Sequence, residues 1–160
     1  MKRVFIILAV VVLCLGIPGL ILGQDNPNIG TWKLNAEKSK YTGVKAPTSL
    51  TRTVTADGDS VKYSFEGTGA DGTALAYGFT VKYDGSDASI TGSGMPYGAD
   101  QIAIKRVNSH TFSATLKKDG KIIGTSRSVV SHDGKTTTLA GKGTDANGKA
   151  VSSTQVYEKQ

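Results

Sequence analysis

Apolar and polar residues alternate along most of the chain after its first 25 residues, which is the pattern of half-buried β-strands. The segment 73–83 shows the alternation most clearly, with Leu75, Tyr77, Phe79, Val81 and Tyr83 on one face and small or polar residues between them. Segments 60–68 and 111–117 repeat it. One buried face and one wet face are what an antiparallel sheet closed on itself requires.

Glycine-centred turns divide these segments at nearly constant intervals. Glycine follows Asp or Asn at positions 58, 72, 85, 120, 134 and 148, and the long gap in this series holds two further turn sequences, at 94–98 and 108–109. Glycine accepts the positive φ of a tight turn, and the neighbouring Asp or Asn bonds its own backbone. The turns predict strands at 29–34, 49–56, 60–68, 73–83, 88–92, 99–107, 111–117, 122–131, 136–143 and 150–158.

About ten strands joined in sequence predict an all-β fold, an up-and-down antiparallel meander with little or no helix. Closing the sheet into a barrel removes its two exposed edges. A barrel of this width has an interior that its own side chains need not fill, so a ligand cavity is expected. A flattened, packed sandwich is the alternative.

The first 23 residues have the features of a secretory signal peptide, an apolar helix with a basic start. Lys2 and Arg3 precede the apolar run from Val4 to Leu22, and Gly23 is followed by polar residues. We expect cleavage after Gly23, export to the periplasm or the exterior, and one mature domain over residues 24–160. An uncleaved anchor is the alternative, because the run is long enough to span a bilayer.

Composition and charge exclude several classes of protein. The only cysteine, Cys14, lies in the signal segment, so the mature domain has neither a disulfide nor a thiol nucleophile. The formal net charge falls by two, from +6 to +4, when Lys2 and Arg3 are removed. The remaining charges are interspersed, which does not fit a nucleic-acid binder.

Two segments at opposite ends of the expected meander resemble the calycin superfamily, the lipocalins and intracellular fatty-acid-binding proteins. Gly30-Thr31-Trp32-Lys33-Leu34 is similar to their opening strand, and Ser153–Lys159 is similar to their last strand. The resemblance implies a β-barrel that binds small molecules, with Trp32 packed at the closed end.

The chain departs from the fatty-acid-binding proteins in two places. Residues 35–47 are too short and polar for the helical lid that follows their first strand. Their last strand often carries an Arg and a Tyr, two residues apart, that hold a carboxylate. Here Tyr157 matches the Tyr, but Gln155 stands at the Arg position. Together with the signal segment, this implies a protein nearer to bacterial lipocalin-like proteins.

Three arginines follow the signal segment, and the alternation places Arg52, Arg106 and Arg127 on the apolar faces of their strands. Inward guanidinium groups would give the cavity an anion-binding character, because each can hold a carboxylate or phosphate with two parallel bonds. The alternative is structural. The resemblance implies a basic side chain packed across Trp32, and Arg106 or Arg127 is the candidate for that position.

The expected ligand site has an apolar wall and a few polar contacts that orient the ligand. Its members are Tyr63, Tyr77, Phe79 and Phe112 on the wall, with Arg52, Arg127, Gln155 and Tyr157 as the polar contacts. Trp32 and Arg106 are assigned to packing. No catalytic residue, metal or cofactor is expected, because no serine lies in a nucleophile elbow and His110 and His132 come from non-neighbouring hairpins without ligand spacing.

Turn positions divide the expected barrel into a basic and an acidic end. Loops 35–48, 70–72, 92–98, 118–121 and 144–149 share the basic end, which also holds the two longest loops and is therefore the expected mouth. The sequence predicts an exported, monomeric, non-enzymatic carrier of a small apolar or amphipathic ligand with anionic character. The alternative is an envelope scaffold whose basic rim contacts a partner or an anionic membrane.

Overall fold

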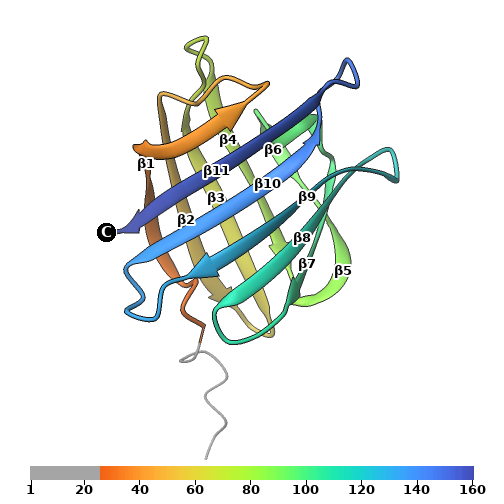
Figure 1. Ribbon diagram of the computed structural model, residues 1–160. Helices are drawn as coiled ribbons and strands as arrows, with labels where there is room; N and C mark the ends of the chain where they lie inside the picture. The colour runs from red at the N-terminus through yellow and green to blue at the C-terminus, as the bar shows by residue number, and fades with distance from the viewer. Residues whose placement is uncertain (1–25) are drawn as a thin grey trace, which may run out of the picture.

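A computed structural model describes residues 26–160, which form a single antiparallel sheet of eleven strands curled into a barrel (Figure 1). The strands are β1 (Gly30–Thr42), β2 (Ser49–Asp57), β3 (Ser60–Thr68), β4 (Ala74–Val81), β5 (Asp84–Ser89), β6 (Thr91–Ser93), β7 (Gln101–Arg106), β8 (Thr111–Lys118), β9 (Lys121–Val130), β10 (Thr136–Thr144) and β11 (Ala150–Lys159). Within this part of the chain the only helical segment is one 3₁₀ turn at Pro96–Gly98. The predicted all-β meander is confirmed.

The strands are ordered β5-β7-β8-β9-β10-β11-β1-β2-β3-β4-β6 across the sheet. Strand β1 pairs with both β2 and β11, so the first and last strands are neighbours. A seam remains between β4 and β5: β5 pairs with β7, while β6 pairs with three residues of β4. The barrel is therefore nearly closed, with β2–β4 on one wall and β8–β11 on the wall facing it (Figure 1).

Two strands differ from the prediction. Strand β1 continues to Thr42 instead of ending at Leu34, because its pairing with β11 is interrupted by a bulge between Asn35 and Lys40 and then resumes. The predicted strand 88–92 is split into β5 and β6. The buried residue Ile90 lies at the point where the chain leaves the β7 edge and crosses the seam to β4.

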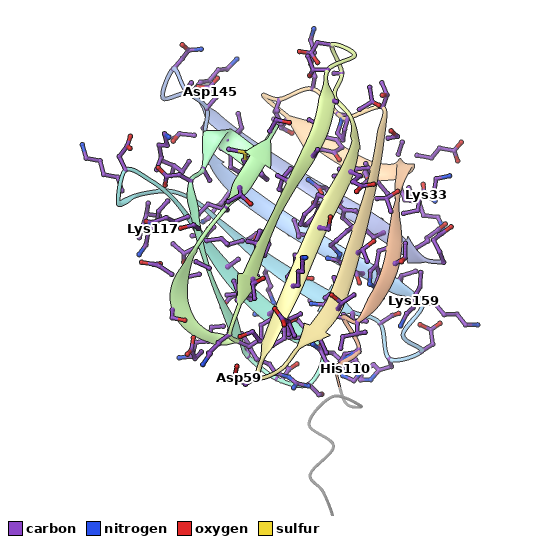
Figure 2. The ribbon with its side chains drawn as sticks, turned by 180° about the vertical axis from the view of Figure 1, so that it is seen from behind. Lys33, Asp59, His110, Lys117, Asp145 and Lys159 are labelled. Atoms are coloured by element: carbon purple, nitrogen blue, oxygen red, sulfur yellow. The ribbon has the colours of Figure 1, made fainter. Side chains whose placement is uncertain are left out.

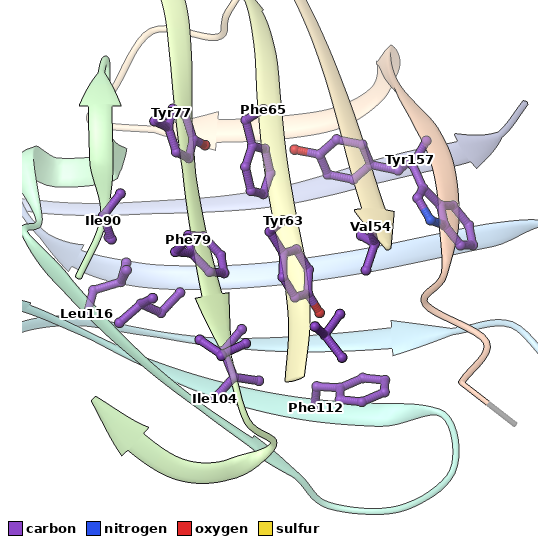
Figure 3. Packing of buried hydrophobic residues seen from close by; sticks show 14 of the residues in the cluster. Val54, Tyr63, Phe65, Tyr77, Phe79, Ile90, Ile104, Phe112, Leu116 and Tyr157 are labelled. Atoms are coloured by element: carbon purple, nitrogen blue, oxygen red, sulfur yellow. The ribbon is translucent and has the colours of Figure 1, made fainter. Parts of the chain in front are cut away.

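The inward faces of β3 and β4 form an aromatic wall (Figure 3). The rings of Tyr63 and Phe79 stack with centroids 4.9 Å apart, and those of Phe65 and Tyr77 stack at 4.6 Å. Each pair joins residues that are register partners on the two strands. The predicted alternation in β4 is confirmed, since Tyr77, Phe79 and Val81 are buried.

The predicted signal segment, its cleavage position and Cys14 lie outside the described residues. Between residues 26 and 160 the structure contains no helix long and apolar enough to cross a membrane.

Candidate functional site

The barrel encloses a cavity of about 120 Å³. By the same measure of volume, a cavity needs about 10–15 Å³ to hold one water molecule. One side of the cavity is apolar, and the residues that form it include Leu50, Phe65, Tyr77, Phe79, Ile102, Ile104 and Leu116. The facing side, on β9–β11, presents Ser126, Ser128, Gly141, Ser153 and Gln155. A few polar groups opposite an apolar wall suit a small molecule that has one apolar side and one polar edge.

Arg52 lies at the deep end of this cavity and is 2% exposed. Its Nη2 donates hydrogen bonds to Asn28 Oδ1 at 3.4 Å and to Thr137 Oγ1 at 3.2 Å, whereas its Nε has no hydrogen-bond partner. No ion pair within residues 26–160 involves this guanidinium. Burial lowers the pKa of Arg52, but a guanidinium stays protonated at physiological pH. The cavity therefore contains a buried cation without a counter-charge.

Two aromatic rings hold the guanidinium in place. The Arg52 Cζ lies 5.3 Å from the ring centroid of Trp32 and 5.0 Å from that of Tyr157. Trp32 is fully buried, and its Nε1 donates to the carbonyl oxygen of Asn28 at 2.8 Å. Cation–π contacts offset part of the cost of burying the charge, but they supply no counter-charge and leave the Nε–H without a hydrogen-bond partner.

A second polar atom in the cavity wall has no partner. Ser128 Oγ is buried and makes no hydrogen bond, and Ser128 is the register partner of Phe112 and Leu139. A buried hydroxyl without a partner costs free energy unless a water or ligand satisfies it. Ser128 is thus a second residue of the cavity wall with an unsatisfied polar atom.

Gln155 and Tyr157 are bonded to each other. The Tyr157 hydroxyl donates to Gln155 Oε1 at 2.7 Å, and Gln155 Nε2 donates to Ser153 Oγ at 3.4 Å. Burial raises the pKa of Tyr157, so its hydroxyl stays neutral. The two residues form a neutral pair, and the cationic group of the cavity comes from β2 instead.

Asn28 completes the deep end, and the sequence analysis did not identify it. Its side chain is buried, accepts from Arg52 and donates to Tyr63 Oη at 2.9 Å. The Tyr63 hydroxyl also lies 2.7 Å from that of Tyr83. The sequence carried no signal for this side chain, because the indole N–H of Trp32 bonds the backbone carbonyl oxygen of Asn28, which any residue type would offer.

The cavity brings together seven of the eight predicted ligand contacts. They are Arg52, Tyr63, Tyr77, Phe79, Phe112, Gln155 and Tyr157. Arg127 was predicted to point inward, and this is wrong. Its side chain is exposed on the outer face of β9, where its register partners are Ser113 and Ala140.

A β-bulge explains the error at Arg127. In the β8–β9 pairing Leu116 faces Gly124 and Lys117 faces Ile122, which leaves Ile123 as an extra residue without a partner. The bulge lets Ile123 reach the core although it belongs to the parity of Arg127. The inward positions after the bulge hold glycine and serine, so the apolar pattern of β9 indicated the wrong face.

The predicted packing of Arg106 across Trp32 is also wrong. Arg106 is exposed, its Cζ lies 5.9 Å from the Phe112 ring centroid, and it donates to the carbonyl oxygens of Asn108 and Ser109, both at 3.3 Å. Its position at the end of β7 lets it fold over the following turn. Arg52 takes the place beside Trp32.

Lys159 lies on Trp32 as well, with Nζ 5.2 Å from the ring centroid. The glycine of the Gly-Thr-Trp sequence makes this contact possible. Gly30 has φ +136°, and a Cβ there would come within 2.6 Å of Lys159 Cε.

The basic end is less charged than the sequence analysis expected. Lys38 pairs with Glu158 at 2.8 Å, Lys117 with Asp87 at 2.6 Å and Lys118 with Asp100 at 3.4 Å. Figure 2 shows Asp145 at this end and Asp59 and His110 at the opposite one. These pairs neutralise part of the rim.

The two histidines lie in contact, which corrects the expectation that their hairpins are not neighbours. The rings of His110 and His132 have centroids 4.9 Å apart, at the end remote from the basic loops. Neither lines the cavity. Across residues 26–160 no group of three or more metal-ligating side chains is assembled.

No family model matches this chain, and no curated protein matches it. Among solved structures it is similar to zebrafish ileal bile acid-binding protein complexed with cholic acid, at 10% identity and a TM-score of 0.49, over 84% of this chain and 99% of that one. A redesigned β-barrel bound to DFHBI matches at 11% identity and a TM-score of 0.44, over 84% and 97%. Lobster apocrustacyanin A1 matches at 13% identity and a TM-score of 0.43, over 84% and 62%.

Proposed function

We propose that this protein binds a small amphipathic molecule with an anionic group inside its barrel, and that it is a carrier or sensor of that molecule without enzymatic activity. The observation that carries the proposal is Arg52, a cation 2% exposed at the deep end of the cavity with an unpartnered Nε. Burying an ion costs several kcal/mol unless it is paired. An anion in the cavity would supply the missing counter-charge.

The cavity favours one orientation of the ligand. Its anionic group would lie at the deep end, between Arg52 and the unpartnered hydroxyl of Ser128. Its apolar body would lie along the stacked rings on β3 and β4, where Phe65 and Tyr77 are 4.6 Å apart. A cavity of about 120 Å³ suits a compact ligand better than an extended one.

A matched pair of probes tests the proposal. We would measure calorimetrically the affinities for 2-naphthoate and for 2-naphthalenemethanol, which share a ring system but differ in charge. The carboxylate should bind at least about tenfold more tightly, because a charge-assisted hydrogen bond contributes about 1.5–3 kcal/mol. Arg52→Met should remove this preference, and Arg127→Met, on the outer face, should keep it. Equal affinities for the two probes in the wild type would contradict the proposal.

We further propose that the carrier is exported, on the basis of the signal-like segment before residue 24, and that it acts as a monomer. Intact mass spectrometry of the protein from its host tests the export. A mass equal to residues 24–160 supports cleavage after Gly23, and the mass of the full chain contradicts it. Sedimentation velocity tests the monomer.

The second candidate function is an envelope scaffold that contacts an anionic membrane through its basic rim. It is favoured by Ile122, which is 66% exposed beside Lys121. An exposed apolar side chain among lysines suits a membrane interface. Binding to anionic but not neutral vesicles that is lost in Lys121→Glu/Ile122→Ser, with carboxylate affinity unchanged, would favour this function.

A further inference from the structure

The turn between β6 and β7 crosses the basic end of the barrel and reaches the cavity. Pro96 and Tyr97 line the cavity, and the buried residue Ala99 anchors the end of the turn. Tyr97 has φ 57° and ψ 14°, a left-handed conformation that is disfavoured for a residue with a Cβ. The turn thus holds a large aromatic side chain in an uncommon backbone conformation directly above the ligand site.

The ring of Tyr97 rests on a surface formed by three glycines, two of which leave little room for a side chain beneath it. A Cβ added at Gly124 or at Gly143 would lie 3.2 Å from Tyr97 Cδ2, and one at Gly141 would lie 3.5 Å from the Tyr97 hydroxyl oxygen. We call these three residues of β9 and β10 the glycine seat. Glycine inside a strand weakens the strand but permits another group to approach closely. The seat therefore lets the Tyr97 ring lie against the inner wall opposite its own turn.

Tyr41 lies beside this closure. It is the register partner of Ser153, a buried cavity residue, and its hydroxyl is buried without a hydrogen-bond partner. Burial and the nearby Tyr97 raise its pKa to about 12, so the hydroxyl stays neutral. Two tyrosines, one on β1 and one in the β6–β7 turn, thus lie near each other.

The turn has few backbone hydrogen bonds to the rest of the barrel. Gly94 and Gly98 flank it with φ values of 78° and 73°. It is held by two hydrogen bonds, from Gly98 N to Met95 O at 3.2 Å and from Ala99 N to Pro96 O at 3.0 Å, both of which lie within the turn. The strand before it, β6, pairs with only three residues of β4. Short pairing and flanking glycines are features of segments that open locally.

We propose that Tyr97 is the entrance residue of the ligand cavity: its ring on the glycine seat closes the basic end, and displacement of residues 94–98 opens it. The closure also sets ligand specificity, because a molecule that extends beyond the cavity keeps the ring off the seat. Compact molecules with a single anionic head, which enter head first toward Arg52, allow it to close. The specificity part rests on the proposed function, whereas the closure is a property of the chain and is testable without a ligand.

The test places a thiol inside the cavity and measures how fast a small neutral reagent reaches it. With Cys14→Ser in the full chain, Ser128→Cys introduces the only thiol, at a buried position that lines the cavity. Its reaction with methyl methanethiosulfonate should be slow. Tyr97→Asn should raise the rate at least about tenfold, because Asn tolerates the left-handed conformation but lacks the ring. Tyr97→Phe keeps the ring and should stay within about twofold of the wild type.

A matched thiol on the other side of the same strand is the control. Thr125 is exposed on the outer face of β9, so Thr125→Cys should react at one rate with every residue at position 97. Should Tyr97→Asn destabilise the fold, Tyr97→Gly removes the ring and the backbone strain together. An unchanged Ser128→Cys rate in both variants would overturn the proposal and favour entry through the β4–β5 seam. Failure of wild-type protein to bind 2-naphthoate would instead count against the proposed function alone.

Discussion

Arg52 and Trp32 are register partners on β2 and β1, and the guanidinium carbon of the first lies 5.3 Å from the ring centroid of the second. The ring of Tyr157 approaches the same guanidinium to 5.0 Å. Stacking on two rings stabilises a cation by about 0.5–2 kcal/mol per ring. The desolvation of an ion costs several kcal/mol, so the contacts position Arg52 without fully offsetting its burial.

Arg52→Met is therefore expected to weaken carboxylate binding while it changes the stability of the fold little. The substitution removes an unpaired buried ion but also two hydrogen bonds, and the opposing effects should leave the free energy of unfolding within about 1 kcal/mol of the wild type. Urea denaturation followed by circular dichroism measures it. A loss above about 3 kcal/mol would show that Arg52 is a packing residue first. Addition of 2-naphthoate should raise the melting temperature of the wild type and not that of the variant.

Trp32→Phe should be far more damaging, although it keeps an aromatic ring. It removes part of a fully buried side chain and leaves the carbonyl oxygen of Asn28 without its donor. We expect a loss of about 2–4 kcal/mol in the free energy of unfolding. Tyr97→Phe is the matched control, since it alters a ring at the other end of the barrel, and it should change stability by less than about 1 kcal/mol. Equal losses in the two variants would contradict the assignment of Trp32 to packing at the closed end of the barrel.

The fold could be predicted because its signals are local. Alternation in β4 identified Tyr77 and Phe79 as inward, and the same reasoning placed Arg52 correctly in β2. It failed for Arg127 because the bulge brings Ile123, which shares the parity of Arg127, into the core, while Arg127 itself faces outward after the bulge. A bulge depends on how two strands pair, and the sequence of one strand does not reveal it.

Other parts of the site were missed because they form between distant segments. Tyr97 is separated by 27 residues from Gly124, on which its ring rests. The signal was present in the alternate glycines Gly141 and Gly143, since glycine inside a strand marks a close approach. The partner in that approach could not be deduced, because any inward aromatic residue at the basic end would have fitted the pattern.

Acid should destabilise the protein through its turns. Asp71 accepts hydrogen bonds from Thr73, and Asp84 from Ser86, in each case from both the backbone N–H and the hydroxyl. These bonds, first those from the hydroxyls, lower the pKa of each carboxyl below its ordinary value of 3.8. The folded pKa lies below the unfolded one, so the stabilisation is present above the unfolded pKa and is lost as pH falls through the folded pKa.

The urea midpoint should therefore fall as pH drops below about 4. Asp71→Asn/Asp84→Asn should lower the midpoint at pH 7 and make the acid decline shallower. Asn can still accept the hydrogen bonds but carries no charge to titrate. An acid decline as steep in the double variant as in the wild type would assign the effect to other carboxyls.

Gly92→Ala tests how strongly the seam depends on β6. Gly92 pairs with Tyr77 on β4, has φ +112°, and a Cβ there would lie 2.1 Å from the carbonyl oxygen of Ala76. The clash is with backbone, which cannot rotate away, so the β4–β6 pairing must open.

Gly148→Ala is the matched control, because Gly148 also has positive φ, +76°, but a Cβ there meets nothing within 4 Å. The control should lose only about 1–2 kcal/mol, the cost of the left-handed conformation. Gly92→Ala should lose at least that and should also accelerate amide exchange across 74–93, measured by hydrogen–deuterium mass spectrometry. Equal exchange in both variants would show that the seam is held by side-chain packing around Ile90, with the three-residue pairing contributing little.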